Sequence, residues 1–288
     1  MPDAATLAVL QDLLTYTILA ILLGVVVYWL FAPVLEDGLL ASEGNVLVRP
    51  YGWQDGLAVM LLLAMLTSNV WSNQGGASAE PLQPGAESTG SPMDQAFSIA
   101  LGSGFMLLMG MALISYLRVF RQLDPGEMFG LRVMPFQRVV LLACLAGLPI
   151  FLFVTALSYI SNELLTDVWH DLTPQAPVKI FQESGHLVVQ GLLAISAVVV
   201  APLAEELLFR GYVYGVIKRY TDSYFAAAAS ALLFALVHLH IGTLLPLFAL
   251  GLILAAAYEL SGSLLMPICI HAFFNAASTA LILAGYGT

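Results

Sequence analysis

The sequence predicts an all-α fold, a polytopic transmembrane helical bundle of about eight spans. Of its 288 residues, 60% are hydrophobic and only 10% are charged, whereas an ordinary soluble domain has roughly 45–50% apolar and 25% charged residues. A water-soluble chain of this length could not hide so much apolar surface. The formal net charge of −10 would also repel phosphate groups, which excludes a nucleic-acid partner. The expected surroundings of the chain are therefore a lipid bilayer.

Each span is placed on an apolar run of about 20 residues, the length that crosses a bilayer as a helix. In the first half of the chain these runs are separated by polar loops. After Asp222 the apolar region is continuous, so breaks are expected at the short polar stretches 240–242 and 261–263. The predicted spans are residues 13–35, 56–72, 95–117, 139–162, 187–204, 223–240, 243–260 and 264–285. The first run is predicted to be a span and not a signal peptide, because no Lys or Arg precedes it.

The basic residues predict the orientation, because cytoplasmic loops are enriched in Lys and Arg. Loop 118–138 contains four arginines, and loop 218–223 begins with Lys218 and Arg219. Both loops are therefore expected to be cytoplasmic. The expected location is the inner (plasma) membrane of a bacterium, where the chain would be an integral membrane protein.

The remaining long loops are acidic. Loops 73–94 and 161–184 are expected outside, and eight spans then place both termini outside. Loop 73–94 is rich in Gly, Ser, Pro and Glu, so it is predicted to be a flexible surface excursion. Loop 36–55 has only Arg49 against four acids, so its charges do not indicate a side.

Ionisable side chains in the predicted spans are confined to the second half of the chain. Inserting one such side chain at the centre of a bilayer costs at least ~2.5–3.5 kcal/mol of free energy, so its presence indicates a structural or functional role. Residues 1–183 are therefore predicted to be a transmembrane scaffold of about four spans, and residues 184–288 a part of about four spans that carries a functional site. The ionisable residues of the last four spans are Glu205, Glu206, Arg210, His238, His240, Glu259 and His271, and Asn275 adds an amide.

The first polar cluster is EELLFR, residues 205–210. Glu206 and Arg210 are four residues apart, in the order that suits an ion pair on one helix face. Glu205 points about 100° away from Glu206 and has no local partner. A carboxylate in apolar surroundings is suited to act as a general base near neutral pH. The structural alternative is a buried ion pair with Glu205 extended towards water.

Two further clusters follow at the same spacing of four residues. Phe234 and His238 would share a helix face, with the ring beside the imidazole; alternatively, His238 bonds a backbone carbonyl. His271 and Asn275 would aim two hydrogen-bonding groups at one point, where they could stabilise an oxyanion. The alternative for this pair is a helix-to-helix hydrogen bond. His240 is expected to be an interfacial residue.

Together the three clusters supply a carboxylate, two imidazoles and an amide. A glutamate with a histidine can hold and deprotonate a water molecule, and further hydrogen-bond donors can receive the charge of a tetrahedral intermediate. This set of groups is suited to hydrolysis of an amide bond without a covalent enzyme intermediate.

The ordered motifs EExxxR, FxxxH and HxxxN, each on an apolar helix, resemble the CPBP family. This family contains CAAX-type intramembrane proteases and bacteriocin-processing or immunity proteins, also known as Abi proteins. The resemblance runs from Ser184 to the C terminus, and all three motifs match without substitution. Residues 1–183 carry no recognised motif. The resemblance implies that 184–288 is a CPBP-like catalytic core.

The resemblance also implies a catalytic role for four residues. Glu205 would activate water together with His238, while His271 and Asn275 would stabilise the oxyanion. The four side chains are predicted to converge on one water-accessible cavity that opens to the cytoplasm. The helix of the fifth span is expected to extend past the bilayer.

Three residues are implied to support this site, namely Glu206, Arg210 and Phe234. The function implied is an intramembrane glutamate-type endopeptidase that hydrolyses a peptide bond in a membrane-anchored protein or peptide, including a lipidated, CAAX-like one. No cofactor or metal is expected. Zinc is the second possibility, because Glu and His are zinc ligands, although no HExxH is present. The non-enzymatic alternative is a membrane immunity, scaffold or transport protein that uses the same polar groups for binding. The sequence assigns no oligomeric state.

Overall fold

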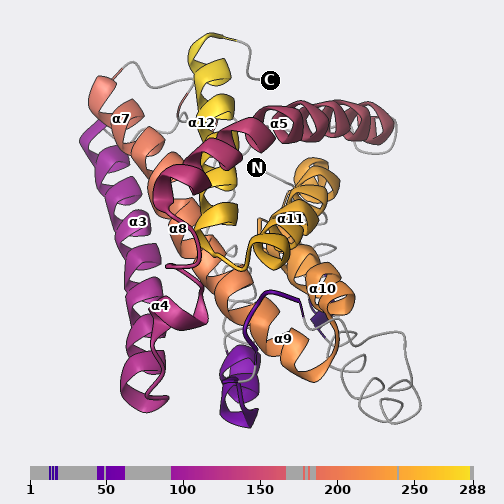
Figure 1. Cartoon of the computed structure of the whole chain (residues 1–288). Coiled ribbons are helices and arrows are strands. Elements are labelled where there is room, and N and C mark those ends of the chain that lie inside the picture. The colour runs from indigo at the N-terminus through magenta and orange to yellow at the C-terminus, as the bar shows by residue number, and fades with distance from the viewer. Residues whose placement is uncertain are drawn as a thin grey trace.

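The computed structural model describes residues 44–61 except 49, 92–166, and 186–285 except 239, with six isolated positions elsewhere (13, 15, 17, 18, 178 and 181). All regular structure in these residues is helical, which confirms the predicted fold class (Figure 1). Most of predicted span 13–35, most of span 56–72 and most of loop 73–94 lie outside the described residues.

Five helices in the described part of the chain are long and apolar enough to cross a bilayer. They coincide with the predicted spans 95–117, 139–162, 187–204, 243–260 and 264–285. The five are α3 (Pro92–Ser115) with its π-helical continuation η2 (Tyr116–Phe120), α5 (Phe136–Thr166), the continuous helix 187–220, α11 (Ile241–Ser261) and α12 (Leu265–Leu283).

The sixth predicted span is shorter than expected. Helix α10 (Ser223–Leu236) has 14 residues and ends before His238, whereas the prediction extended the span to residue 240. The side chain of Asp222 caps its first turn by accepting hydrogen bonds from the backbone of Tyr224 and Phe225. At 1.5 Å per residue this helix is about 21 Å long, less than the ~30 Å hydrocarbon core of a bilayer.

The outer surfaces of these helices are apolar. On α3 the side chains of Met93, Phe97, Leu101 and Phe105 are each more than half exposed, and their spacing of four residues places them on one face. Helix α5 exposes a similar row that includes Leu145. Such continuous apolar surface is suited to contact with lipid and not with water. The chain is an integral membrane protein.

The helix 187–220 is built from alternating α- and π-helical segments. These are α7 (Leu187–Ile195), η3 (Ser196–Val200), α8 (Ala201–Glu206), η4 (Leu207–Tyr214) and α9 (Gly215–Tyr220). Its 34 residues correspond to about 50 Å of α-helix, more than the bilayer core needs. The prediction that this helix continues past the bilayer is consistent with that length. π-helical turns within α-helices occur frequently at functional sites.

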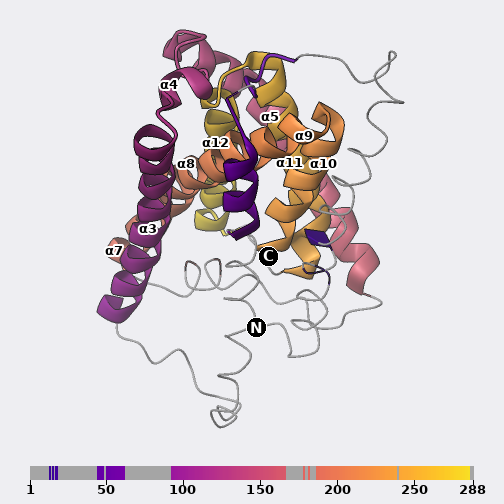
Figure 2. The ribbon, with the colours of Figure 1, turned by 90° about the horizontal axis from the view of Figure 1, so that it is seen from below.

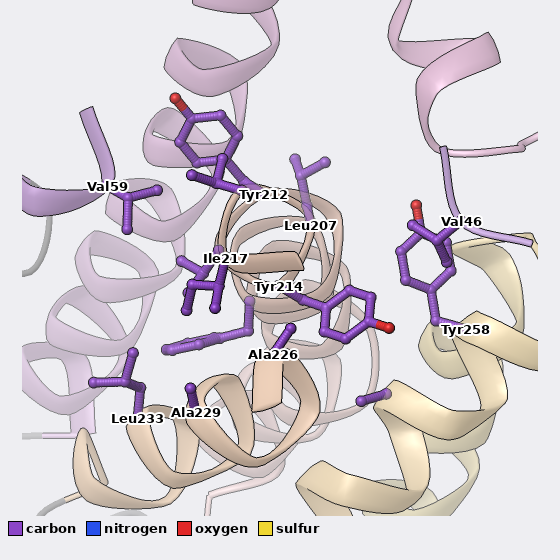
Figure 3. Close-up of a cluster of buried hydrophobic side chains, with 14 of the residues drawn as sticks. Val46, Val59, Leu207, Tyr212, Tyr214, Ile217, Ala226, Ala229, Leu233 and Tyr258 are labelled. Carbon is purple, nitrogen blue, oxygen red and sulfur yellow. The ribbon is translucent and has the colours of Figure 1, made fainter. Parts of the chain in front are cut away.

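The main buried cluster lies in the second half of the chain. It joins η4, α9, α10 and α11, with Leu207, Ile217, Leu233 and Tyr258 among its members (Figure 3). Val46, from the N-terminal part of the chain, reaches the same cluster. Helix α5 crosses α12 and packs against α11 and α12 (Figure 1).

The segment 44–61 packs against small residues of the long helix. The hydroxyl of Tyr51 donates a hydrogen bond to the carbonyl of Gly211, and the Tyr51 ring lies where a side chain at Gly215 would be, with its nearest atom 2.6 Å from a Cβ built there. One turn further, Nε of Arg219 donates to the Tyr51 carbonyl at 3.3 Å. Figure 2, which views the bundle from below, shows this segment in indigo lying across the helices.

A second set of contacts brings the turn after α11 to the same end of the bundle. Asn45 donates through Nδ2 to the carbonyl of Leu260 at 3.0 Å. Gly130 and Gly262 both have positive φ and lie so close that a Cβ on Gly130 would overlap the Gly262 oxygen. The loops 118–138 and 218–223 therefore lie at one end together with the described part of loop 36–55. The structure thus places the described part of loop 36–55 on the same side as loops 118–138 and 218–223, which its own charges did not indicate.

Candidate active site

The Glu206–Arg210 ion pair lies at the centre of the site. Nη1 of Arg210 is 3.0 Å from Oε1 of Glu206, and neither side chain has any exposed surface. Nη2 of the same guanidinium donates to the carbonyl of Gly251 on α11 at 3.2 Å, and its Cζ lies 4.5 Å from the centroid of the Phe234 ring. The i,i+4 pair expected from the sequence is thus present, and α10 and α11 supply its other contacts.

His271, which lies on α12, contacts both of the adjacent glutamates of α8. Its Nδ1 is 2.9 Å from Oε1 of Glu206, and its Nε2 is 3.9 Å from Oε2 of Glu205. Glu206 forms an ion pair with Arg210, and a carboxylate only accepts hydrogen bonds, so Nδ1 of His271 is the donor. Glu206 therefore orients the ring so that Nε2 is directed towards Glu205.

Glu205 differs from its neighbour in exposure. Its side chain is 16% exposed, compared with 0% for Glu206. The pair is consecutive in α8, so the two carboxylates diverge by about 100°. The 3.9 Å separation between Glu205 and His271 is too long for a direct hydrogen bond. The arrangement suits a water molecule that contacts both groups.

Phe234 connects the two histidines. Its ring centroid lies 4.9 Å from that of His238 and 5.8 Å from that of His271, both in edge-to-face geometry. Nδ1 of His238 is 2.7 Å from the carbonyl oxygen of Phe234. A carbonyl only accepts, so Nδ1 carries the proton and Nε2 of neutral His238 is an acceptor. His238 lies in the turn after α10 and not within a helix as expected.

Asn275 makes a hydrogen bond to a neighbouring helix. Its Nδ2 donates to the carbonyl of Ala197 in η3 at 2.7 Å. The sequence interpretation named such a bond as the alternative to an oxyanion role. The structure therefore brings Glu205, Glu206, Arg210, Phe234, His238 and His271 together by a chain of contacts, and it gives Asn275 a backbone partner on the helix that carries both glutamates.

Glu259, which the sequence also places in a span, belongs to a different cluster. Nζ of Lys218 lies 2.7 Å from its Oε1, and the hydroxyl of Tyr214 donates to its Oε2. This cluster is at the end of the bundle where segment 44–61 packs, since the backbone N–H of Val46 also approaches Glu259. Glu205 and Glu206 therefore belong to the candidate site, whereas Glu259 connects the end of α11 to α9 and to segment 44–61.

Sequence reasoning missed two groups that the structure joins to the helix 187–220. Gly251 supplies the carbonyl that receives Arg210. The fully buried Asp55 accepts hydrogen bonds from Tyr212 of that helix at 3.4 Å, from Arg121 at 2.9 Å and from Tyr116 at 3.2 Å. The hydrogen bonds to Asp55 raise the pKa of the Arg121 guanidinium. In the sequence, Gly251 could have been found as a small residue within a run of large apolar ones. Asp55 could have been found as an acidic residue at the start of an apolar run.

Within the described ranges, no group of three or more His, Cys, Asp and Glu side chains is arranged to hold a metal ion. The water-accessible cavity predicted for the four motif residues stays a prediction, as do their individual roles.

Three comparisons with known proteins bear on this region. Residues 188–277 match the sequence model of the family "Type II CAAX prenyl endopeptidase Rce1-like", a range that includes every motif residue described above. An 84-residue stretch is 31% identical to a protein of Bacillus subtilis (strain 168) named "Putative membrane peptidase YdiL". This stretch is 29% of the present chain and spans about a third (34%) of that relative. No solved structure gives a significant match to the chain.

Proposed function

We propose that the chain is an intramembrane endopeptidase that hydrolyses a peptide bond in a membrane-anchored protein or peptide by a glutamate-type, metal-independent reaction. The observation that carries the proposal is the contact of His271 with both Glu205 and Glu206 in a buried site. It is supported by the family match over 188–277 and by the relative named a membrane peptidase. The bacterial inner membrane is the proposed location.

In this proposal Glu205 is the general base. A water molecule bound between Glu205 and the imidazoles gives one proton to the Glu205 carboxylate as its oxygen attacks the scissile carbonyl. The carbon–nitrogen bond of the tetrahedral intermediate then breaks, and the proton held by Glu205 passes to the leaving amine. The acceptor nitrogen Nε2 of His238 takes the second hydrogen bond of the water, which leaves a lone pair of the water oxygen free to attack.

Glu206 and Arg210 act through His271. Glu206 is fixed by Arg210 and bonds Nδ1 of His271, in the way that a carboxylate orients a catalytic imidazole in other hydrolases. In this proposal His271 acts as an imidazolium with a proton on each nitrogen, so that Nδ1–H donates to Glu206 and Nε2–H donates to the oxyanion. Asn275 is the fourth residue of the motif set, and its role is considered in the next subsection.

The substrate class follows from the position of the site. Glu205 lies within an apolar helix, so a substrate held in the same bilayer reaches it by lateral diffusion. A lipidated segment of CAAX type is the substrate suggested by the name of the matched family. Comparing the termini of membrane proteins from cells with wild-type chain and cells with Glu205→Gln would identify the natural substrate.

The decisive experiment is cleavage of a fluorescent, lipid-anchored peptide by the full chain in proteoliposomes. Glu205→Gln has nearly the same volume but lacks a basic carboxylate, so turnover should fall by about 10²–10⁴-fold. Glu163→Gln is the matched control, because Glu163 is exposed at the end of α5, and it should leave turnover unchanged. Turnover by Glu205→Gln equal to wild type would contradict the proposal.

The same assay tests metal independence. Activity should survive dialysis against a strong chelator, with no stoichiometric metal in the active protein. Loss of activity in chelator with recovery on addition of zinc would favour the zinc hypothesis instead.

A further inference from the structure

The carbonyl that Asn275 contacts lacks the backbone donor that an α-helix would supply. In an α-helix the carbonyl of Ala197 would accept from the N–H of residue 201. Here the N–H of Ala201 bonds Ser196 instead, five residues back, which is the π-helical pattern of η3. The next residue that could donate in that pattern is Pro202, which has no N–H.

A backbone carbonyl inside a bilayer must find a partner, because water is absent from the hydrocarbon region. Nδ2 of Asn275 supplies that partner at 2.7 Å. Only the nitrogen of the amide can donate to a carbonyl, so this contact determines which way the amide points. The hydrogen bond thus stabilises a π-helical turn that the proline leaves incomplete.

Helix α12 holds both ends of the short helix α8 by this contact and one other. Asn275 bonds Ala197, just before α8 begins, and His271 bonds Glu206, the last residue of α8. On the α3 side, Ser103 donates to the hydroxyl of Ser196 at 2.8 Å. The six residues that carry both glutamates are therefore held at their start and at their end.

The π-helical turn determines which way the glutamates face. One extra residue in a helix rotates everything after it by about 100° relative to everything before it. That angle is also the angle between consecutive side chains, so loss of the turn would rotate Glu205 into the direction that Glu206 now has relative to α7, and would rotate Glu206 away from it by the same angle. The ion pair with Arg210 depends on Glu206 having the buried direction.

We propose that Asn275 is a positioning residue: its amide completes the π-helical turn that Pro202 leaves open, and it thereby sets the directions in which Glu205, as the exposed base, and Glu206, as the buried partner, meet His271. Its effect on catalysis rests on the proposed function, whereas its effect on the helix does not. This role differs from donation to an oxyanion, because Asn275 acts through α8 and not on the substrate.

The test is a double-mutant cycle between positions 275 and 202 in the full chain. Asn275→Asp keeps the size of the side chain but removes its donor, and should lower kcat by about 10- to 100-fold with KM within about twofold. Pro202→Ala adds an N–H that can donate to the Ala197 carbonyl. Alone it should keep activity within about threefold, because the Asn275 bond remains. Added to the Pro202→Ala variant, Asn275→Asp should lower kcat by less than about threefold.

Pro246→Ala is the matched control, because Pro246 lies inside α11 and not in the 196–202 turn. In that background Asn275→Asp should have its full effect. An equal loss of kcat with and without Pro202→Ala would overturn the inference and would favour an oxyanion role. An inactive Pro202→Ala single variant would overturn it as well.

The midpoint temperature of thermal unfolding in detergent gives a second double-mutant cycle, which does not depend on peptidase activity. Asn275→Asp should lower the midpoint when Pro202 is present and have a smaller effect in the Pro202→Ala variant. If this coupling is present in a chain without peptidase activity, the positioning role holds and the proposed function fails. If the midpoints are simply additive, the positioning role fails whether or not the chain is a peptidase.

Discussion

The consecutive carboxyl groups of Glu205 and Glu206 lie in different surroundings. Oε1 of Glu206 receives both Arg210 and His271 with no exposed surface, while Glu205 keeps 16% exposure and faces only the far nitrogen of the same imidazole. Glu206, which is held by a cation and an imidazole, is suited to orient His271. Glu205, which is partly exposed and has a more distant partner, is suited to react with water. The difference comes from helix rotation, since neighbouring side chains diverge by about 100°.

The buried ion pair makes a prediction about stability. Arg210→Met should destabilise the chain by about 3–5 kcal/mol, because the Glu206 carboxylate would be left buried without its cation. The measurement is unfolding of the purified protein in mixed micelles by denaturant. The double variant Glu206→Gln/Arg210→Met removes both charges and should recover more than half of that loss.

The double variant also separates two explanations. If Arg210 contributes mainly by packing against Phe234 and bonding Gly251, neutralising Glu206 should recover nothing. That result would contradict the account of Glu206 as a carboxylate held by Arg210. Peptide cleavage by the double variant should in either case be low, because His271 has lost the carboxylate that orients it.

At the scale of the helices, the close approach of α10 and α11 is what places Arg210. A Cβ built on Gly251 would lie 2.8 Å from Cβ of Ala231, 2.9 Å from its Cα and 3.2 Å from Nη2 of Arg210. Small residues allow helix backbones to approach closely in membranes. Here the approach brings the Gly251 carbonyl within hydrogen-bond distance of the guanidinium.

Gly251→Ala should therefore force α10 and α11 apart and destabilise the chain by about 1–3 kcal/mol, with reduced cleavage as Arg210 loses its acceptor. The check is the same denaturant unfolding together with kcat. Gly102→Ala on α3 is the control, since a Cβ there has no neighbour within 4 Å, and it should cause no loss of stability. Equal stability of the two variants would show that the α10–α11 contact is not tight.

At the scale of the whole molecule, loops far apart in the sequence meet at one end of the bundle. Segment 44–61 contacts Arg121 through Asp55, Arg219 through Tyr51 and the turn after α11 through Asn45. The contacts of Tyr51 and Asn45 join the predicted scaffold 1–183 to the predicted core 184–288. The boundary between the two stays a prediction, although the described contacts across it are extensive.

Because these loops share an end, they should share a side of the membrane. In a background of Cys144→Ala and Cys269→Ala, single cysteines at the exposed positions Gln54 and Glu127 should be labelled by a membrane-impermeant maleimide in inside-out vesicles only. A cysteine at the exposed His186, before α7 begins, should be labelled in intact cells. Labelling of positions 54 and 127 from opposite sides would contradict the packing of segment 44–61.

Part of the fold and site could be predicted because the signals are local. The apolar runs of α3, α5, α11 and α12 are long enough for a bilayer, and the Glu206–Arg210 pair follows from a spacing within one helix. The end of α10 was predicted four residues too late, because no charged residue marks it. Spans 13–35 and 56–72 lie mostly outside the described residues, so they stay predictions.

The sequence alone was enough to establish a helical membrane protein whose ionisable side chains within the spans are concentrated in residues 205–275. This is possible because the free energy of transfer into lipid depends on the polarity of each side chain separately. The packing of the helices was needed to show that His271 joins both glutamates and that Asn275 bonds the turn before them. Those contacts depend on the register of α12 against the helix 187–220, which many packed side chains set together and which the spacing within either helix does not contain.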